Sequence, residues 1–179
     1  MGKLCKFGLL GAIAGILPLL ATTLQQLTLP EMAQKSTAIV RARVKTSKGV
    51  LRGSDVYTVY QLEPVDVWKS PVSGAPREVA VPGGVAGGLR QPVDGAPSLV
   101  EGREYVLFLW TSKTGLTQLI GLSQGLFDVR ADGGVATVWR GVASERMLDA
   151  SGRPVRDQAV SMKLAELKAQ VARAVVEAR

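Results

Sequence analysis

The chain has 179 residues, of which 46% are hydrophobic and 21% charged, and a formal net charge of +7 at pH 7. This length allows one ordinary domain with some additional segments, and the apolar content excludes wholesale disorder. The sequence has no His and a single Cys, so it lacks the commonest general base, the commonest metal ligand and any intrachain disulfide. Catalytic mechanisms that depend on these groups are excluded.

The N-terminus has the form of an export signal. Lys3 and Lys6 precede an uncharged run over residues 7–20, which is shorter than the roughly 20 residues that a membrane-spanning helix needs. Small residues follow and predict cleavage near residues 21–23, so we expect a periplasmic or extracellular protein. The alternative is a retained leader that anchors the domain at the outer face of a membrane. Cys5 lies ahead of the apolar run, a spacing that does not support a lipid anchor.

The first ordered element is predicted to be a short helix that ends near Lys35. Thr28 and Glu31 have the spacing of a capping box, and Pro30 between them is tolerated in a first helical turn. Residues 38–44 then alternate between apolar and polar side chains, which predicts a strand with one buried face and one cationic face.

Six further strands are predicted from β-branched, aromatic and alternating apolar residues. They cover residues 56–68, 77–82, 105–110, 117–122, 126–130 and 135–140. Pro64 predicts a bulge or an edge position in its strand, and the unbroken apolar run over residues 105–110 predicts burial on both faces. No helix-length pattern separates the strands, so we expect an antiparallel barrel or sandwich and no doubly wound parallel sheet.

The periodicity changes near the C-terminus. Apolar residues fall at helical spacing over residues 161–179, which predicts an amphipathic helix that covers a barrel end or a sheet edge. The predicted organisation is a signal peptide over residues 1–23, a β-barrel domain over 24–142, a polar connector over 143–160, and the terminal helix.

Residues 121–125 read Gly-Leu-Ser-Gln-Gly and match the nucleophile elbow of serine hydrolases. That chemistry needs a base beside Ser123, and without His only a Ser–Lys pair is conceivable. The elbow also joins a strand to a helix, whereas residues 126–130 predict another strand. We therefore interpret the pattern as a tight connection between strands whose glycines permit positive φ, and we predict no catalytic residue.

Other apparent motifs lack parts that their chemistry requires. Residues 82–90 are Gly-rich but have neither the Gly-Lys-Ser/Thr ending nor the following helix of a phosphate-binding loop. The carboxylates show no calcium-loop spacing, so neither a metal nor a cofactor is predicted. Glu101 with Glu104, or Glu63 with Asp66, could act as an acid–base pair only if the fold brought each pair together. Surface carboxylates are the simpler interpretation.

Residues 41–54 contain five basic residues and no acidic one. They are Arg41, Arg43, Lys45, Lys48 and Arg52. Such a run is either a solvated strand face or a docking surface for an anionic partner, such as a polysaccharide or an acidic protein. The export signal and the low aromatic content disfavour nucleic acid as that partner.

The order of the elements resembles the netrin-like module of tissue inhibitors of metalloproteinases. The resemblance is carried by AIVRARV (residues 38–44), VDVWK (65–69), EVAV (78–81) and GREYVLFL (102–109). It implies a mainly β fold: an OB-type antiparallel barrel, closed or partly open, with a short N-terminal helix and an amphipathic C-terminal helix. In that family, inhibition depends on a mature N-terminal cysteine that chelates the protease zinc. This sequence has no mature cysteine, so the resemblance assigns this inhibitory role to no residue of the chain.

A second resemblance is to a group of exported bacterial proteins that share three segments with this chain. These segments are PGG-x-x-GGLR at residues 82–90, GAP at 95–97 and GLSQG followed by x-F at 121–127. This resemblance implies export and no particular activity.

Residues 83–103 form a long connection, and connections of this length are usually functional or disordered. OB-type barrels bind with a strand face and the loops around it. We therefore predict a partner-binding surface made of Leu89, Arg90, Asp94, Arg41 and Arg43, in which Arg90 offers a bidentate contact to a carboxylate or phosphate.

The expected function is that of an exported, non-enzymatic module that binds a protein or an anionic glycan at the cell envelope or outside the cell. We expect no cofactor, no nucleic-acid partner and no stable membrane insertion of the mature chain. Two alternatives are an envelope assembly protein that oligomerises through its C-terminal helix and a serine hydrolase that uses Ser123.

Overall fold

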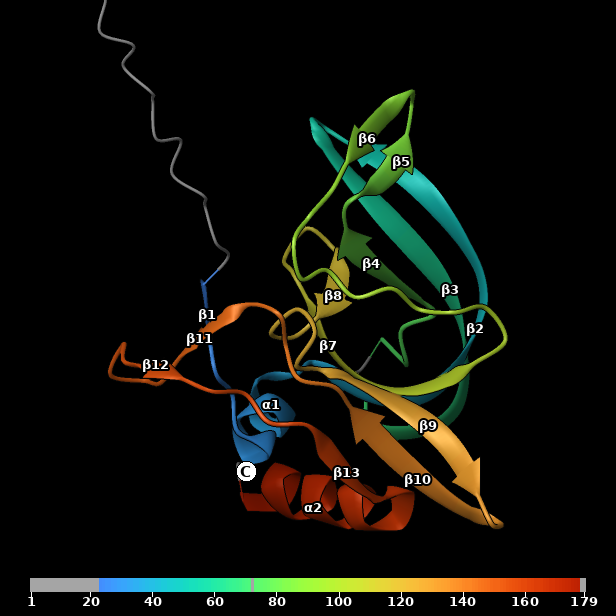
Figure 1. Ribbon diagram of the computed structural model, residues 1–179. Coiled ribbons are helices and arrows are strands. Elements are labelled where there is room, and N and C mark those ends of the chain that lie inside the picture. Colours follow the sequence, from blue (N-terminus) through green and yellow to red (C-terminus); the bar gives the residue numbers. More distant parts are fainter. Residues whose placement is uncertain (1–22, 72, 178–179) are drawn as a thin grey trace, which may run out of the picture.

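The computed structural model describes residues 23–71 and 73–177 (Figure 1). The predicted leader up to residue 22 lies outside the described residues, and so does Cys5. Neither of the two helices in the described part is long and apolar enough to cross a membrane.

Eight strands form one antiparallel sheet in the order β13-β10-β9-β7-β2-β3-β4, with β8 paired to β7 beside this path. Their bounds are β2 Ala38–Arg52, β3 Asp55–Lys69, β4 Glu78–Pro82, β7 Glu104–Thr111, β8 Thr117–Leu119, β9 Leu126–Asp132, β10 Val135–Arg140 and β13 Val160–Lys163. All seven predicted strands are present, and the predicted mainly β, antiparallel class is confirmed.

The long strands β2 and β3 curve strongly because their pairing contains register shifts (Figure 1). At one shift Arg41 pairs with Asp66 and Ala42 pairs with Pro64, which leaves Val65 between them without a partner. Pro64 cannot donate a backbone hydrogen bond, so a bulge beside it costs the ladder little. The bulge predicted at Pro64 is confirmed.

The curved sheet does not close into a barrel. β4 and β8 lie close to each other, but no ladder of hydrogen bonds joins them in the described part of the chain. β8 has only three residues, and its pairing is with β7. Of the two predicted forms, the closed barrel is therefore not found.

Apolar side chains form one core on each face of the sheet. The core on the concave face includes Val40, Leu107 and Leu109. The other core, between the sheet and the two helices, includes Val106 and Phe108. Because β7 contributes to both cores, the predicted burial on both faces is confirmed for Tyr105 to Leu109, although Trp110 is 45% exposed.

The two helices lie together on the convex face (Figure 1). α1 (Leu29–Lys35) begins with the predicted capping box, in which the Glu31 carboxylate accepts a 2.8 Å hydrogen bond from the Thr28 amide. α2 (Leu164–Glu177) buries the stripe Leu167, Val171 and Ala174, as predicted for a helix that covers the sheet. It begins three residues later than predicted because residues 160–163 form β13.

Besides β13, five short strands were not predicted. They are β1 (Thr23–Gln25), β5 (Gly84–Ala86), β6 (Leu89–Gln91), β11 (Arg146–Leu148) and β12 (Pro154–Val155). β1 pairs in parallel with β11, and β11 pairs with β12. The predicted polar connector over residues 143–160 therefore contains paired strands, and its Met147 is buried.

Candidate binding sites

The end of the β2–β3 hairpin and the β5–β6 hairpin together form a protruding end of the molecule, at the top of Figure 1. We call residues 48–55 and 84–91 the knob. The two hairpins pack so closely at Gly49 that a Cβ there would collide with the Val85 carbonyl. Thr58 Oγ1 donates a 2.9 Å hydrogen bond to the Gly83 carbonyl, and the Val56 amide donates one of 2.7 Å to Gln91 Oε1. These contacts hold the β5–β6 hairpin in a defined position.

The knob surface combines exposed apolar and cationic side chains. The apolar ones are Leu51, Val85 and Leu89, with exposed fractions of 45%, 61% and 52%. The cationic ones are Lys48, Arg52 and Arg90, all exposed and without an ion pair among the described residues. Asp55 is the one acid in the knob. The knob therefore offers excess positive charge around an apolar centre.

The structure brings together only part of the predicted binding surface. Leu89 and Arg90 lie in the knob, and Asp94 is exposed in the connection that follows β6. Arg41 and Arg43 lie near the other end of β2. Since a strand rises about 3.3 Å per residue, the six positions from Arg43 to Gly49 span about 20 Å. The two arginines are therefore not part of the knob.

Arg41 and Arg43 are instead bound to a carboxylate of β7. Their guanidinium groups contact the Glu104 carboxylate at 2.6 and 2.7 Å. Partial burial opposes ionisation of Glu104, but the hydrogen bonds from both arginines outweigh it and hold the pKa of this carboxyl below its usual range. The pairing was missed because Glu104 is more than 60 positions away in the sequence.

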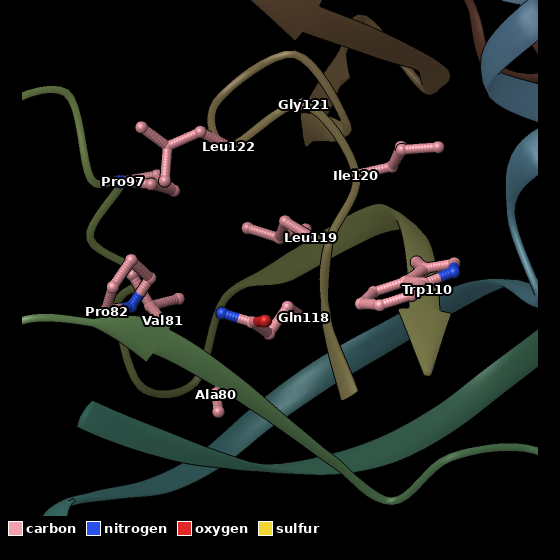
Figure 2. A pocket seen from close by; sticks show the side chains of 10 residues that line it. All are labelled: Ala80, Val81, Pro82, Pro97, Trp110, Gln118, Leu119, Ile120, Gly121 and Leu122. Carbon is pink, nitrogen blue, oxygen red and sulfur yellow. The ribbon is translucent and has the colours of Figure 1, made fainter. Parts of the chain in front are cut away.

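A small apolar pocket lies in the seam between β4 and β8, with a volume of about 190 Å³ (Figure 2). Ile120 donates its amide to the Phe108 carbonyl, so the backbone of the neighbouring Leu119 faces away from β7. By the same alternation, the backbone N–H and C=O groups of Ala80 in β4 point away from β3. Figure 2 shows the exposed ring of Trp110 beside this pocket, which the sequence did not predict.

A larger groove, of about 550 Å³, is lined by residues 95–98, the start of β7, β9, β10 and the segment 141–144 that follows β10. Arg103 donates two hydrogen bonds to Asp128, of 2.9 and 2.7 Å, and Arg130 Nε donates one of 3.0 Å to the same carboxylate. The Arg130 guanidinium also lies 4.5 Å from the ring centre of Trp139. These four side chains form one connected network in the groove.

Two polar atoms are buried without a hydrogen-bond partner among the described residues. Glu145 Oε2 is near this groove, whereas Arg140 Nε belongs to a side chain on the opposite face of β10, against the Phe127 ring. Arg140 Nη2 donates to Asp157 at 2.9 Å, and the Arg140 side chain is only 11% exposed. Glu145 Oε1 accepts a long hydrogen bond, 3.5 Å, from Ser123 Oγ. Buried polar groups are nearly always satisfied by protein, water or ligand, so these atoms mark unmet hydrogen-bonding capacity.

The Gly-Leu-Ser-Gln-Gly segment is accounted for by packing. Gly121 has a φ of 59°, and a Cβ at Gly125 would crowd the Phe108 carbonyl. Gln124 is fully buried; its side chain donates to the Gln25 carbonyl and accepts from the Leu27 amide. Through these two hydrogen bonds, Gln124 ties the chain before α1 to the segment. The segment is followed by β9, as predicted.

The candidate acid–base pairs are bound to other groups. Glu101 accepts a hydrogen bond from Ser47, and Asp66 accepts one from Lys168. Within residues 23–71 and 73–177, no three His, Cys, Asp or Glu side chains are grouped so that they could hold a metal ion. Comparisons with protein-family models, curated proteins and solved structures found no match to this chain.

The apolar stripe of α2 is covered within the chain. Leu167, Val171 and Ala174 belong to the same core as Met32 of α1 and Val138 of β10. Assembly through α2 would therefore have to use its polar face, on which Val176 is an exposed apolar residue.

Proposed function

We propose that this protein is an exported, non-enzymatic binding module of OB type that docks onto an acidic protein through its knob. The observation that carries the proposal is the knob surface, where Leu51, Val85 and Leu89 are exposed among cations that have no ion pair in the described part of the chain. Exposed apolar side chains with a charged rim are typical of interaction sites.

The strand order supports the OB-type assignment. Counted along the chain within the eight-stranded sheet, to which β5 and β6 do not belong, β2, β3, β4, β7 and β8 are strands one to five. They are arranged in the order three-two-one-four-five. An OB barrel has this order, with strands three and five meeting at its closure. The seam between β4 and β8 is the place where that closure would occur. The loop between strands one and two, a common binding element of OB folds, is here part of the knob.

The shape and composition of the knob favour a protein partner. It is a protrusion rather than a groove, and its exposed apolar side chains are aliphatic, so they offer no stacking platform for nucleic-acid bases. The close packing at Gly49 fixes the two hairpins before binding, which lowers the ordering cost. Arg90 adds a planar group that can bind a carboxylate through two hydrogen bonds.

The test is binding of an immobilised peptide of alternating Glu and Leu residues, followed by capture from the exported fraction of the host. The double variant Leu89→Ser with Arg90→Glu is expected to lose roughly tenfold or more in affinity, and raised salt should weaken wild-type binding. Arg173→Glu is the charge-matched control, because Arg173 is exposed on α2 at the far end of the molecule.

Retention of full affinity by the double variant would overturn the assignment to the knob. If that variant unfolds, Arg90→Glu alone decides the matter, since this exposed side chain has no ion pair to lose within the described residues.

A further inference from the structure

The groove beside β9 and β10 is a second concave site, separate from the knob. Its volume of about 550 Å³ falls in the range of small-molecule sites, roughly 300–1,000 Å³. Its lining is mixed, with the aromatic ring of Trp139, the phenol ring of Tyr105 and the charged groups of Arg103, Asp128 and Arg130. A ligand must therefore offer both an apolar face and polar groups.

Trp139 presents an aromatic surface to the groove. It pairs with Asp128 across the β9–β10 hairpin, so the two side chains lie on the same face of the sheet. Trp139 is 39% exposed although Arg130 lies against its ring. Gly141 lies so close to this ring that a Cβ there would come within 2.9 Å of Cη2. The ring is thus in contact with Arg130, close to Gly141, and still accessible.

The charged groups of the groove are positioned before any ligand binds. Asp128 is 12% exposed and is shared by two guanidinium groups, those of Arg103 and Arg130, which are each about half exposed. One carboxylate between two arginines leaves a net positive charge and free N–H donors. The groove can therefore accept an anionic group without first rearranging its side chains.

A ligand in the groove meets both hydrogen-bond donors and hydrogen-bond acceptors. The donors are the half-exposed guanidinium groups of Arg103 and Arg130. The acceptors are the carboxylate of Asp128 and that of Glu145, which accepts a hydrogen bond from the lining residue Ser123 and has a buried unpartnered Oε2. Hydroxyl groups can satisfy both kinds of atom. A purely anionic ligand such as a nucleic-acid backbone would meet the Asp128 carboxylate without a hydrogen to donate.

We propose that this groove binds an acidic oligosaccharide. One sugar ring stacks its C–H face on Trp139, and a carboxylate or sulfate of the same or a neighbouring sugar binds Arg103 and Arg130. The hydroxyl groups of the sugar exchange hydrogen bonds with Asp128 and the wall of the groove.

The test uses calorimetric titration of the chain with a galacturonic acid tetramer, a sulfated heparin tetramer and the neutral cellotetraose. We expect binding of at least one acidic tetramer, and weaker binding of cellotetraose. Trp139→Ala should reduce the affinity roughly tenfold or more, whereas Trp139→Phe should retain part of it. Arg103→Gln should abolish the preference for the acidic sugar. The two acidic probes distinguish carboxylate from sulfate recognition.

Trp110→Ala is the matched control, because Trp110 is similarly exposed but lies at the seam pocket. Absence of binding by all three probes at about 1 mM would overturn the proposal, and so would equal effects of Trp139→Ala and Trp110→Ala. Should Trp139→Ala unfold, the affinities of the conservative variants Trp139→Phe and Arg103→Gln test the proposal instead. The knob variants should bind the oligosaccharide normally, so failure of one site does not imply failure of the other.

Discussion

Phe108 is the residue on which the packing between the sheet and the helices most depends. It is fully buried, and its ring centre lies 5.6 Å from that of Phe127 on the neighbouring strand β9. Phe108→Ala removes this contact and leaves a cavity, so it should lower the free energy of unfolding by about 3–5 kcal/mol. Chemical denaturation measures the change. A loss below about 1 kcal/mol would contradict the central place of Phe108 in the core.

Glu104 pairs with two arginines of β2, Arg41 and Arg43, and so offsets part of their positive charge. Its folded pKa is lowered, so the stability that it contributes is present above the ordinary glutamate pKa of about 4.3 and is lost as the pH falls through the folded value. Glu104→Gln should cost about 1–3 kcal/mol at neutral pH, since Glu104 is 17% exposed and its partners keep their charges.

Unfolding free energies of wild type and Glu104→Gln, measured between neutral pH and about pH 3, test this sign. The difference between the two proteins should shrink as the pH falls. Glu101→Gln is the control, because Glu101 is exposed, accepts a hydrogen bond from Ser47 and has no ion pair among the described residues. A difference that is constant with pH would show that the ionised carboxylate contributes nothing.

At the scale of the elements, the knob depends on one glycine in the middle of a long strand. Gly49 does not have a positive φ, so Ala is acceptable to its backbone, but the added Cβ would collide with the Val85 carbonyl. Gly49→Ala should therefore displace the β5–β6 hairpin while the sheet stays folded. Hydrogen exchange should become faster at residues 84–91. Lys48→Ala, the adjacent exposed position, should leave exchange unchanged.

The sequence predicted the elements with a long apolar pattern, and it missed most of the strands of two to four residues. β2, β3 and β7 carry a long apolar pattern, so local periodicity was sufficient. β5 and β6 have three residues each in a Gly-rich segment, and their position depends on contacts with Gly49 and Thr58. No local pattern encodes such contacts between distant segments.

In the candidate sites, too, local sequence indicated some residues, and only the fold brings the others into place. Leu89 and Arg90 were predicted as binding residues because the segment around them mixes apolar and charged side chains, which a plain connection does not require. Arg130 and Trp139 could have been found from the predicted β9–β10 hairpin, since pairing across its turn places Trp139 opposite Asp128. Arg103 could not, because it precedes β7 and meets Asp128 across 25 positions of the sequence.

At the scale of the whole molecule, the parallel pair of β1 and β11 has a consequence for the order in which the chain folds. Thr23 pairs with Arg146, and Gln26 donates its amide to the Leu148 carbonyl. These partners are more than 120 positions apart, so the entropy of closing the intervening chain must be overcome before their bonds form. In a chain that emerges from a ribosome or a translocation channel N-terminus first, the ladder between β1 and β11 cannot be completed until Leu148 has emerged. The earliest described segment of the chain is therefore among the last to complete its hydrogen bonds.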